Sequence, residues 1–196
     1  MMSYTFYLLI AYLLGSIPVG VLVTRLSGHG DLRSVGSGNP GATNVMRVGG
    51  LRLAGLTWLL DMAKAIIAVL LGTYAGGDVF GAWCGFVAIV GHCFPIWSRF
   101  RGGKGISCLF GLFLAINPLV FVFCGIEWLI VALSLGYSSL GALCVLVVAP
   151  ILCFNISFGV GLAMLACSLL CLWRHRENIG RLVGGTESKL KWKWKK

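Results

Sequence analysis

Long apolar segments alternate with short polar ones along the whole of this chain. At 1.5 Å per residue, about 20 apolar residues are enough to cross a hydrocarbon core of roughly 30 Å. The pattern therefore predicts membrane-spanning helices over residues 3–24, 53–74, 79–96, 106–135, 140–154 and 158–173. Short polar turns are expected between them, at residues 75–78 and 155–157 among others.

Two of these segments are interrupted. Gly15, Ser16 and Pro18 break the first one, which we interpret as retained rather than as a cleaved signal peptide, because no charged region precedes it. Asn117-Pro118 falls near the middle of residues 106–135. Since proline ends or kinks a helix, two short helices joined by a turn fit that segment better than one long span.

Composition then settles the class of protein. The chain has 196 residues, of which 58% are hydrophobic and 11% are charged, and its mean hydropathy is +0.92. These shares exclude an ordinary soluble domain and indicate a single all-α polytopic membrane domain over residues 1–196. The net charge of +10 would suggest nucleic acid in a soluble protein. Here it fits the bilayer surface and anionic substrates, with no nucleic acid partner.

The distribution of positive charge predicts the orientation. Lys64 is the one Lys or Arg, of 16 in all, outside the two basic loops and the C-terminal tail. Basic loops stay in the cytoplasm, so an even number of crossings must separate these three regions. Seven spans with the N-terminus outside and the C-terminus in the cytoplasm satisfy this, and five spans do so if residues 106–173 cross only twice. The Lys/Trp tail, residues 185–196, suits a lipid-touching surface segment or a disordered end.

The first polar segment contains a glycine-rich stretch, residues 36–44, followed by Arg47. Closely spaced glycines let the backbone approach a ligand and direct successive N–H groups at a phosphate. An ordinary turn between two helices is the alternative. The candidate ligand-binding residues here are Gly36, Ser37, Gly38, Asn39, Gly41, Thr43, Asn44 and Arg47.

Two further polar groups carry candidates. Asp61 and Lys64 are three residues apart on one helix face, where they can pair and support a site, a purely structural pair being the alternative. The second basic loop holds Lys104, a compact cation beside Gly102 and Gly103. Among the histidines, His175 lies in a dense polar cluster with Glu177 and Asn178, His92 is either a site residue or a helix-end packing residue, and His29 is an ordinary loop residue.

Several kinds of chemistry are excluded. Gly36, Gly38 and Gly41 match Gly-x-Gly-x-x-Gly, but no βαβ unit is predicted around them, so a dinucleotide site is ruled out. Gly103-Lys104 lacks the other residues of a nucleotide P-loop. Cys167 and Cys171 share a helix face, yet no His or acid completes a metal set, and we expect neither metal nor cofactor. No prepared Ser or Cys nucleophile with a base is evident either.

Polar motifs at residues 36–47, 91–105 and 174–187 would all face one side of the membrane, which predicts a shared anion site there. In order and spacing the chain resembles the bacterial acyl-phosphate-dependent glycerol-3-phosphate acyltransferases. Ala65, Cys108 and Arg101 depart from the usual glycine, threonine and lysine. The resemblance rests on Gly36 to Asn44 with Arg47, on Asp61 and Lys64, on Gly91-His92-x-Phe94-Pro95 with Gly102 to Gly105, and on His175 to Arg181 with Gly185-x-Glu187.

The resemblance implies a seven-helix enzyme of the bacterial inner membrane with its site at the cytoplasmic face. It would transfer a fatty acyl group from acyl phosphate to the 1-hydroxyl of glycerol 3-phosphate, the first step of phospholipid biosynthesis. Products would be 1-acyl-glycerol 3-phosphate and phosphate. The acyl chain would lie in a groove between helices, open to lipid. Coupling to an enzyme that produces acyl phosphate is also implied.

Residue roles follow from the same resemblance. Catalytic roles fall to Ser37, Arg47, Lys104 and His175. Arg47, Lys104 and Asn178 would hold glycerol 3-phosphate, while Ser37, Thr43, His175 and the loop amides would hold acyl phosphate. The remaining substrate-binding positions are Gly36, Gly38, Asn39, Gly41, Asn44, Asp61, Lys64, His92, Gly102, Gly103, Ser139 and Glu177.

Two other functions are alternatives. A transporter or binding protein for a phosphorylated small molecule explains the basic loops, but it needs polar residues along a path across the bilayer. Outside Asp61, Lys64 and Glu127, the spans offer almost none. A CDP-alcohol phosphotransferase needs a run of metal-binding aspartates, which this sequence lacks.

Overall fold

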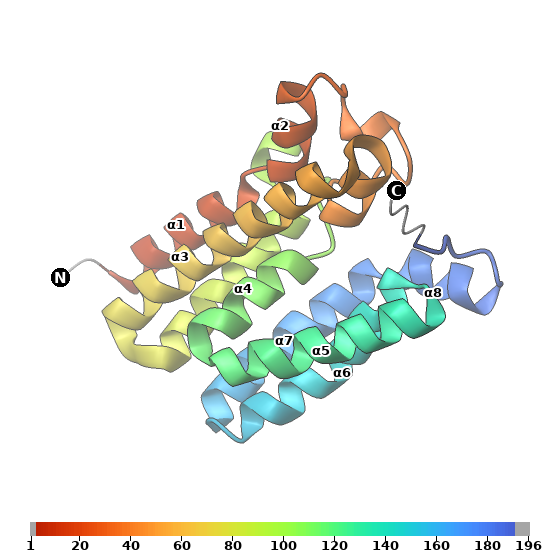
Figure 1. Cartoon of the computed structure of the whole chain (residues 1–196). Coiled ribbons are helices and arrows are strands. Elements are labelled where there is room, and N and C mark those ends of the chain that lie inside the picture. Colours follow the sequence, from red (N-terminus) through yellow and green to blue (C-terminus); the bar gives the residue numbers. More distant parts are fainter. Residues whose placement is uncertain (1–2, 191–196) are drawn as a thin grey trace.

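The computed structural model describes residues 3–190, which form a bundle of helices with no strand among them (Figure 1). Helix lengths follow the apolar segments closely. The elements are α1 (Tyr4–Ser16), α2 (Val19–Leu26), η1 (Leu32–Ser34), α3 (Ala42–Cys93), η2 (Ile96–Ser98), α4 (Ile106–Ile116), α5 (Pro118–Leu135), α6 (Ser138–Phe154), α7 (Phe158–Arg174) and α8 (Arg176–Val183).

Helix α3 is a folded-back pair rather than one rod. Its 52 residues would be roughly 78 Å long if straight, but Gly76 and Gly77 leave the helical conformation, and Gly77 has φ 78°. Only glycine adopts such angles without strain. The halves on either side pack together, since a Cβ on Gly72 would lie 2.9 Å from the Cα of Gly81. The turn expected at residues 75–78 is therefore confirmed, in a tighter form.

Small residues bring the helices of the bundle close together. A side chain on Gly15 or Gly91 would overlap the backbone of the facing helix, as would one on Gly111. Such contacts are typical of membrane helices, where association depends on close packing rather than on expulsion of water. The large apolar side chains they leave buried include Ile89, Leu112 and Met164.

Three helical stretches are long and apolar enough to cross a membrane: Tyr4–Leu26, Ala42–Ser98 and Pro118–Leu135. The bent pair α7 and α8 makes a fourth if it counts as one span. Helices α4 and α6 are apolar but shorter. The break expected at Asn117-Pro118 is confirmed, with the Asn117 side chain accepting a hydrogen bond from the Leu119 amide at 2.9 Å.

The structure corrects two boundaries. Residues 42–49, expected in a loop, already form the first turns of α3, which bends at Gly50, where φ is 82°. The motif after residue 174, expected as the start of the C-terminal tail, forms helix α8, bent by 57° from α7. Residues 191–196 of the predicted Lys/Trp tail lie outside the described residues.

The polar motifs gather at one end of the bundle. In Figure 1 the segment between α2 and α3, the loop before α4 and helix α8 all lie on the right, whereas the bend of α3 and the turn between α6 and α7 lie on the left. Turns far apart in sequence are thus brought together, which is what a shared site requires.

Candidate active site

A cavity of about 660 Å³ opens between the start of α3, helices α4 and α5, the start of α6, and α8. Its two ends differ in chemistry. Aliphatic and aromatic side chains line one end, among them Leu51, Trp58, Phe110, Phe121 and Leu129. Polar and charged side chains line the other: Ser37, Asn39, Thr43, Asn44, Arg47, His92, Lys104, Ser107, Ser138, Ser139, His175, Asn178, Arg181, Glu187 and Ser188.

Asn44 holds the glycine-rich stretch in shape. Its side-chain oxygen accepts from the Ser37 amide at 2.9 Å, and its amide nitrogen donates to the carbonyl of Val35 at 3.0 Å. Gly36 has φ 61°, and a Cβ there would overlap the Asn44 side chain. The Gly38 amide also bonds internally, to Val35. The Ser37 and Gly38 amides are therefore committed to the loop, which corrects the expectation that they point at a ligand.

The start of α3 is the other part of the backbone that suits an anion. Gly41 is its N-cap and supplies no side-chain hydrogen bond, so no capping side chain covers the first amides, and Gly41 to Asn44 line the cavity. Helix N-termini attract anions through these amides and the helix dipole. Thr43, in the same turn, lies 3.3 Å from Ser138 across the cavity, hydroxyl to hydroxyl.

Arg174 fixes the loop that carries Lys104. Its guanidinium donates to the carbonyls of Gly102 at 2.8 Å and Gly103 at 3.0 Å. The amides of the same two glycines donate to the carbonyls of Cys93 and His92, at 3.1 and 3.0 Å. Glycine is required at both positions, because a Cβ on either would overlap His92. The loop is therefore rigid on both sides, and it presents Lys104 to the cavity.

Lys104 begins a chain of hydrogen bonds along α8. It donates to the side-chain oxygen of Asn178, whose nitrogen donates to Glu187 at 2.7 Å. Glu187 also accepts from Ser139 at 2.7 Å and from Arg181 at 2.6 Å. Burial opposes ionisation of Glu187, but these hydrogen bonds outweigh it and lower its pKa. Arg181 is thereby neutralised, while Lys104 faces only a neutral amide.

Two groups of the polar end have pKa values shifted by burial. Burial, together with the nearby Arg181, lowers the pKa of Lys104 to about 8. Burial lowers the pKa of His175 to about 4, so the ring is neutral at pH 7. Its Nδ1 lies 2.7 Å from the carbonyl of Cys171, and a carbonyl can only accept. Nδ1 therefore carries the proton, and Nε2 is left as a hydrogen-bond acceptor.

Comparison with known proteins decides the family. Residues 5–185 match the glycerol-3-phosphate acyltransferase family. The chain belongs to this family. Its relatives include glycerol-3-phosphate acyltransferases of Rhizobium etli, 45% identical over 92% of this chain and 88% of that protein, and of Roseobacter denitrificans, 44% identical over 92% and 91%. The family resemblance expected from the sequence is confirmed.

Solved structures agree with this assignment. The chain superimposes with a TM-score of 0.92 on the glycerol 3-phosphate form of PlsY, an integral membrane glycerol 3-phosphate acyltransferase, at 35% identity over 97% of this chain and 96% of that one. The lysophosphatidic acid form gives 0.89 at 32% identity, with the same coverage. The all-helical membrane fold is therefore that of the acyltransferase family.

Most site residues expected from the acyltransferase motifs line the cavity. Seven do not: Gly36 and Gly38 shape the first loop, Gly102 and Gly103 support the second, Asp61 and Lys64 are buried behind His92, and Glu177 is exposed outside the cavity.

Glu187, rather than Glu177, is the carboxylate of the site. Glu187 and Arg181 belong to the C-terminal motif of the sequence, but the sequence alone assigned neither of them a role in the site. Ser107, Ser138 and Ser188 were missed as well; each is next to or near a motif residue. Glu127, whose place was left open, does not line the cavity, and one of its oxygens is buried without a hydrogen-bond partner among the described residues.

Asp61, Lys64 and His92 form a buried cluster beside the cavity, which His92 also lines. Lys64 Nζ lies 2.7 Å from Asp61 Oδ1 and 3.1 Å from His92 Nδ1, and it donates to the carbonyl of Ile17 at 2.9 Å. Asp61, His92 and Cys108 have ligand atoms within 4.8 Å of one another, a juxtaposition that sequence spacing did not predict. The Lys64 ammonium already occupies the cation position beside Asp61, which disfavours a metal ion there.

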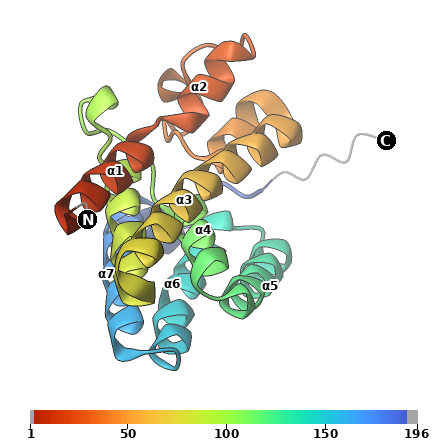
Figure 2. The ribbon, with the colours of Figure 1, turned by 90° about the vertical axis from the view of Figure 1, so that its left-hand side faces the viewer.

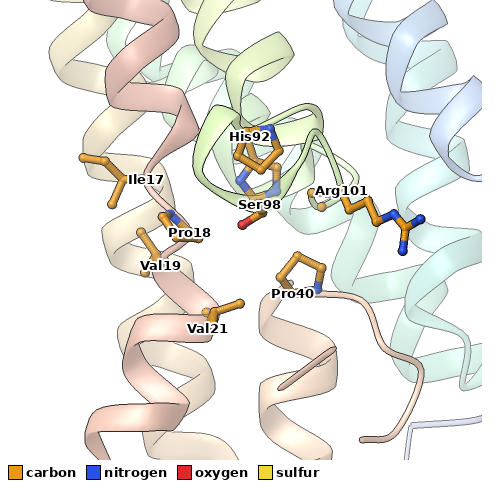
Figure 3. A pocket seen from close by; sticks show the side chains of 12 residues that line it. Ile17, Pro18, Val19, Val21, Pro40, His92, Ser98 and Arg101 are labelled. Carbon is orange, nitrogen blue, oxygen red and sulfur yellow. The ribbon is translucent and has the colours of Figure 1, made fainter. Parts of the chain in front are cut away.

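A second cavity lies next to this cluster but is too small for a substrate. Its volume is about 10 Å³, roughly the room that one water molecule needs. Figure 3 shows Pro18 and Val19 on one side of it and Pro40 and Ser98 on the other, with the guanidinium of Arg101 pointing away. The space is a packing void where the broken first helix meets the two polar loops.

Proposed function

We propose that this chain transfers a fatty acyl group from acyl phosphate to the 1-hydroxyl of glycerol 3-phosphate, releasing 1-acyl-glycerol 3-phosphate and phosphate. The observation that carries the proposal is the continuity of one cavity, about 660 Å³ in volume, from a polar end with Arg47 and Lys104 to an apolar end with Trp58 and Phe110. Phosphate groups suit the first end and an acyl chain suits the second. Neither end alone would specify this reaction.

Two phosphates can be held by different parts of the polar end. Lys104, Arg47 and Asn178 would bind glycerol 3-phosphate. Lys104 and Arg47 supply positive charge, and Arg47 makes no side-chain hydrogen bond or ion pair within residues 3–190. The acyl phosphate would lie against Ser37, Thr43 and the uncapped start of α3. This division brings the acyl carbonyl between the two phosphates, near His175.

The chemistry needs positioning more than activation. The glycerol hydroxyl oxygen attacks the acyl carbonyl carbon, and the bond from that carbon to the phosphate oxygen breaks, so the oxygen leaves with the phosphate. A mixed anhydride has a good leaving group, and a fixed pair of substrates gains much of its rate from orientation and from stabilisation of the oxyanion. We propose direct attack without an acyl-enzyme.

The hydroxyl proton has two routes. It goes to an oxygen of the acyl phosphate itself or to Nε2 of His175, which is unprotonated because Nδ1 carries the ring proton. Turnover of His175→Ala separates them: substantial remaining activity supports the substrate-assisted route, and loss of activity with intact substrate binding supports His175. A trapped covalent acyl-enzyme would overturn both.

We also propose seven crossings of the inner membrane, with the N-terminus outside and the site at the cytoplasmic face. The alternation of turns between the two ends of the bundle supports this count (Figure 1). Alkaline phosphatase fused after residue 77 or residue 156 should be active, and fused after residue 104 or residue 190 inactive. A fusion after residue 117, between α4 and α5, separates the two counts: it should be active with seven crossings, and inactivity there would favour five, with residues 106–135 not crossing.

The decisive assay uses purified protein in detergent with labelled glycerol 3-phosphate and palmitoyl phosphate, without added metal, CoA or carrier protein. Labelled lysophosphatidate is the expected product. Activity that appears only after acyl-CoA is added would refute the donor. If the donor is correct, the chain depends on an enzyme that produces acyl phosphate, and adding one to the assay should sustain turnover.

A further inference from the structure

The apolar end of the cavity has three walls. Helix α4 forms the back, and α3 and α5 flank it, each packed on α4 (Figure 2). An aromatic row crosses all three helices: the ring centroids of Trp58 and Phe110 are 6.3 Å apart, and those of Phe110 and Phe121 are 5.9 Å apart. Val122, Ile126 and Leu129 line the cavity yet are about half exposed, so the groove is open along one side.

Two glycines lie on the flanking walls, Gly55 on α3 and Gly125 on α5. A Cβ on Gly55 would meet nothing within 4 Å, and one on Gly125 would meet only the Phe110 ring, at 3.9 Å. Neither has a positive φ. Gly111, in contrast, is needed for helix packing, because a Cβ there would overlap the backbone of Met62. Helix packing therefore requires a glycine at Gly111, but neither helix packing nor backbone conformation requires one at Gly55 or Gly125.

A glycine inside a helix lowers stability relative to alanine. At these two positions the only structural consequence is empty space inside the groove. Gly55 is about one turn before Trp58 on α3, and Gly125 is about one turn after Phe121 on α5. Because α3 starts at the polar end and α5 runs toward it (Figure 1), both glycines lie on the polar side of the aromatic row and line the same groove from opposite walls.

We propose that Gly55 and Gly125 determine which acyl chains the groove accepts, by leaving a gap through which a long unbranched chain passes toward Phe121 and Trp58. The inference rests on the proposed function and adds the selection of the acyl donor to it. A chain too short to reach the gap is insensitive to what stands there. A longer chain has to pass between the two positions, so any bulky residue at either one would shorten the accepted length.

The test is a size series at one position. Gly125→Ala, Gly125→Val and Gly125→Leu are compared with the wild type by the ratio of kcat/KM for palmitoyl phosphate to that for octanoyl phosphate. Alanine fits at 3.9 Å and should leave the ratio within about twofold, whereas leucine should lower it at least tenfold, with valine between. The KM for glycerol 3-phosphate should not change. Gly55→Leu should act in the same direction from the opposite wall.

Ser134→Leu is the matched control, because it adds the same side chain to α5 at an exposed position outside the cavity; its ratio should equal that of the wild type. An equal loss for both donors in Gly125→Leu, or an unchanged ratio, overturns the inference.

A binding readout separates this outcome from failure of the proposed reaction. Thermal stabilisation by 1-palmitoyl and 1-octanoyl lysophosphatidate needs no turnover, and Gly125→Leu should lose the preference for the longer chain. If the wild type turned over no acyl phosphate, the proposed function would fail while this measurement would still decide the role of the two glycines.

Discussion

The protein contains two charged clusters built from similar residues, and they behave differently. Asp61 and Lys64 are only 1% and 4% exposed, and each faces the opposite charge. Lys104 faces a neutral amide and a cavity of about 660 Å³. A buried charge whose counter-charge is supplied by the protein contributes to the scaffold. A charge without a counter-charge beside it remains available to a ligand, and the proposed function assigns Lys104 the phosphate of a substrate.

The comparison also explains why the polar end holds one carboxylate. Glu187 accepts from Ser139, Asn178 and Arg181 at once, so it organises donors around the cavity and neutralises Arg181. Glu187 also positions Lys104 through Asn178. Lys104 keeps its charge because its own hydrogen-bond partner is a neutral amide. The two clusters are joined by His92, which contacts Lys64 on one side and lines the cavity on the other.

The largest expected effect comes from breaking the buried pair. Lys64→Met leaves the Asp61 carboxylate buried without its cation, which should destabilise the protein by about 3–5 kcal/mol. Thermal unfolding in detergent measures this. Replacing both groups, with Asp61→Leu added to Lys64→Met, should recover most of the loss, because no unpaired charge remains. An unchanged Tm for Lys64→Met would contradict a scaffold role for the cluster.

Lys104→Ala should lower activity rather than stability, in contrast to Lys64→Met. Removal of a cation aimed at a substrate phosphate should lower kcat/KM by about 10²–10³-fold, the cost typical of losing one strong donor to a charged group in an active site. Tm should stay the same or rise, since burial disfavours the Lys104 ammonium in the folded protein. The same assay and the same melting experiment, run side by side with Lys64→Met, measure both. A fall in Tm with retained turnover would show instead that Lys104 stabilises the fold and is not needed to bind the substrate.

The alkaline limb of the pH profile should reflect Lys104. Its pKa of about 8 is that of the free enzyme, and the protonated form binds phosphate. Above about pH 8, kcat/KM for glycerol 3-phosphate should therefore fall about tenfold per pH unit. In the complex the phosphate favours the protonated lysine, so kcat should hold to higher pH. Lys104→Arg, if active, should lack the fall. A profile that is flat to pH 10 in the wild type would exclude this role.

Glu187→Gln should have the smallest effect. The amide oxygen can still accept from Ser139 and Asn178, but the charge that pairs with Arg181 is lost, so kcat/KM should fall by about 5–20-fold, equivalent to about 1–2 kcal/mol. Because Glu187 raises the pKa of Lys104, the alkaline limb of the profile should also move to lower pH. Asp78→Asn, which changes an exposed carboxylate at the bend of α3 and outside the cavity, is the control and should leave both unchanged.

Much of this architecture could be predicted from the sequence. The break at Asn117-Pro118, the turn near Gly76 and the last two long helices were expected from hydropathy and from proline chemistry, and the structure has them. The gathering of the three motifs followed from charge. Helix α8 was not expected as a helix, because its charged, polar sequence gains its order from contacts that span the chain, such as Asn178 with Lys104.

The individual roles could not be predicted. Ser37 and Gly38 read as phosphate-binding amides, but their N–H groups bond to Asn44 and Val35. Glu177 and Glu187 both lie in the C-terminal motif, and only their position relative to Lys104 separates them. The proximity of Asp61, His92 and Cys108 joins residues from different helix segments, for which the spacing along the chain offers no signal.

The sequence by itself determined that the protein is embedded in a lipid bilayer, because long apolar segments have to be buried in lipid. It also determined the class of ligand, since basic, glycine-rich turns between these segments favour anions. The tertiary structure alone decided which cations stay available and where the acyl groove runs. Charge compensation and empty space are properties of side chains from different helices, and their distances are fixed by helix packing rather than by position in the chain. Lys104 shows this. Spacing along one helix already pairs Lys64 with Asp61, whereas only the packing of the second basic loop against α8 gives Lys104 a neutral amide, that of Asn178, as its partner.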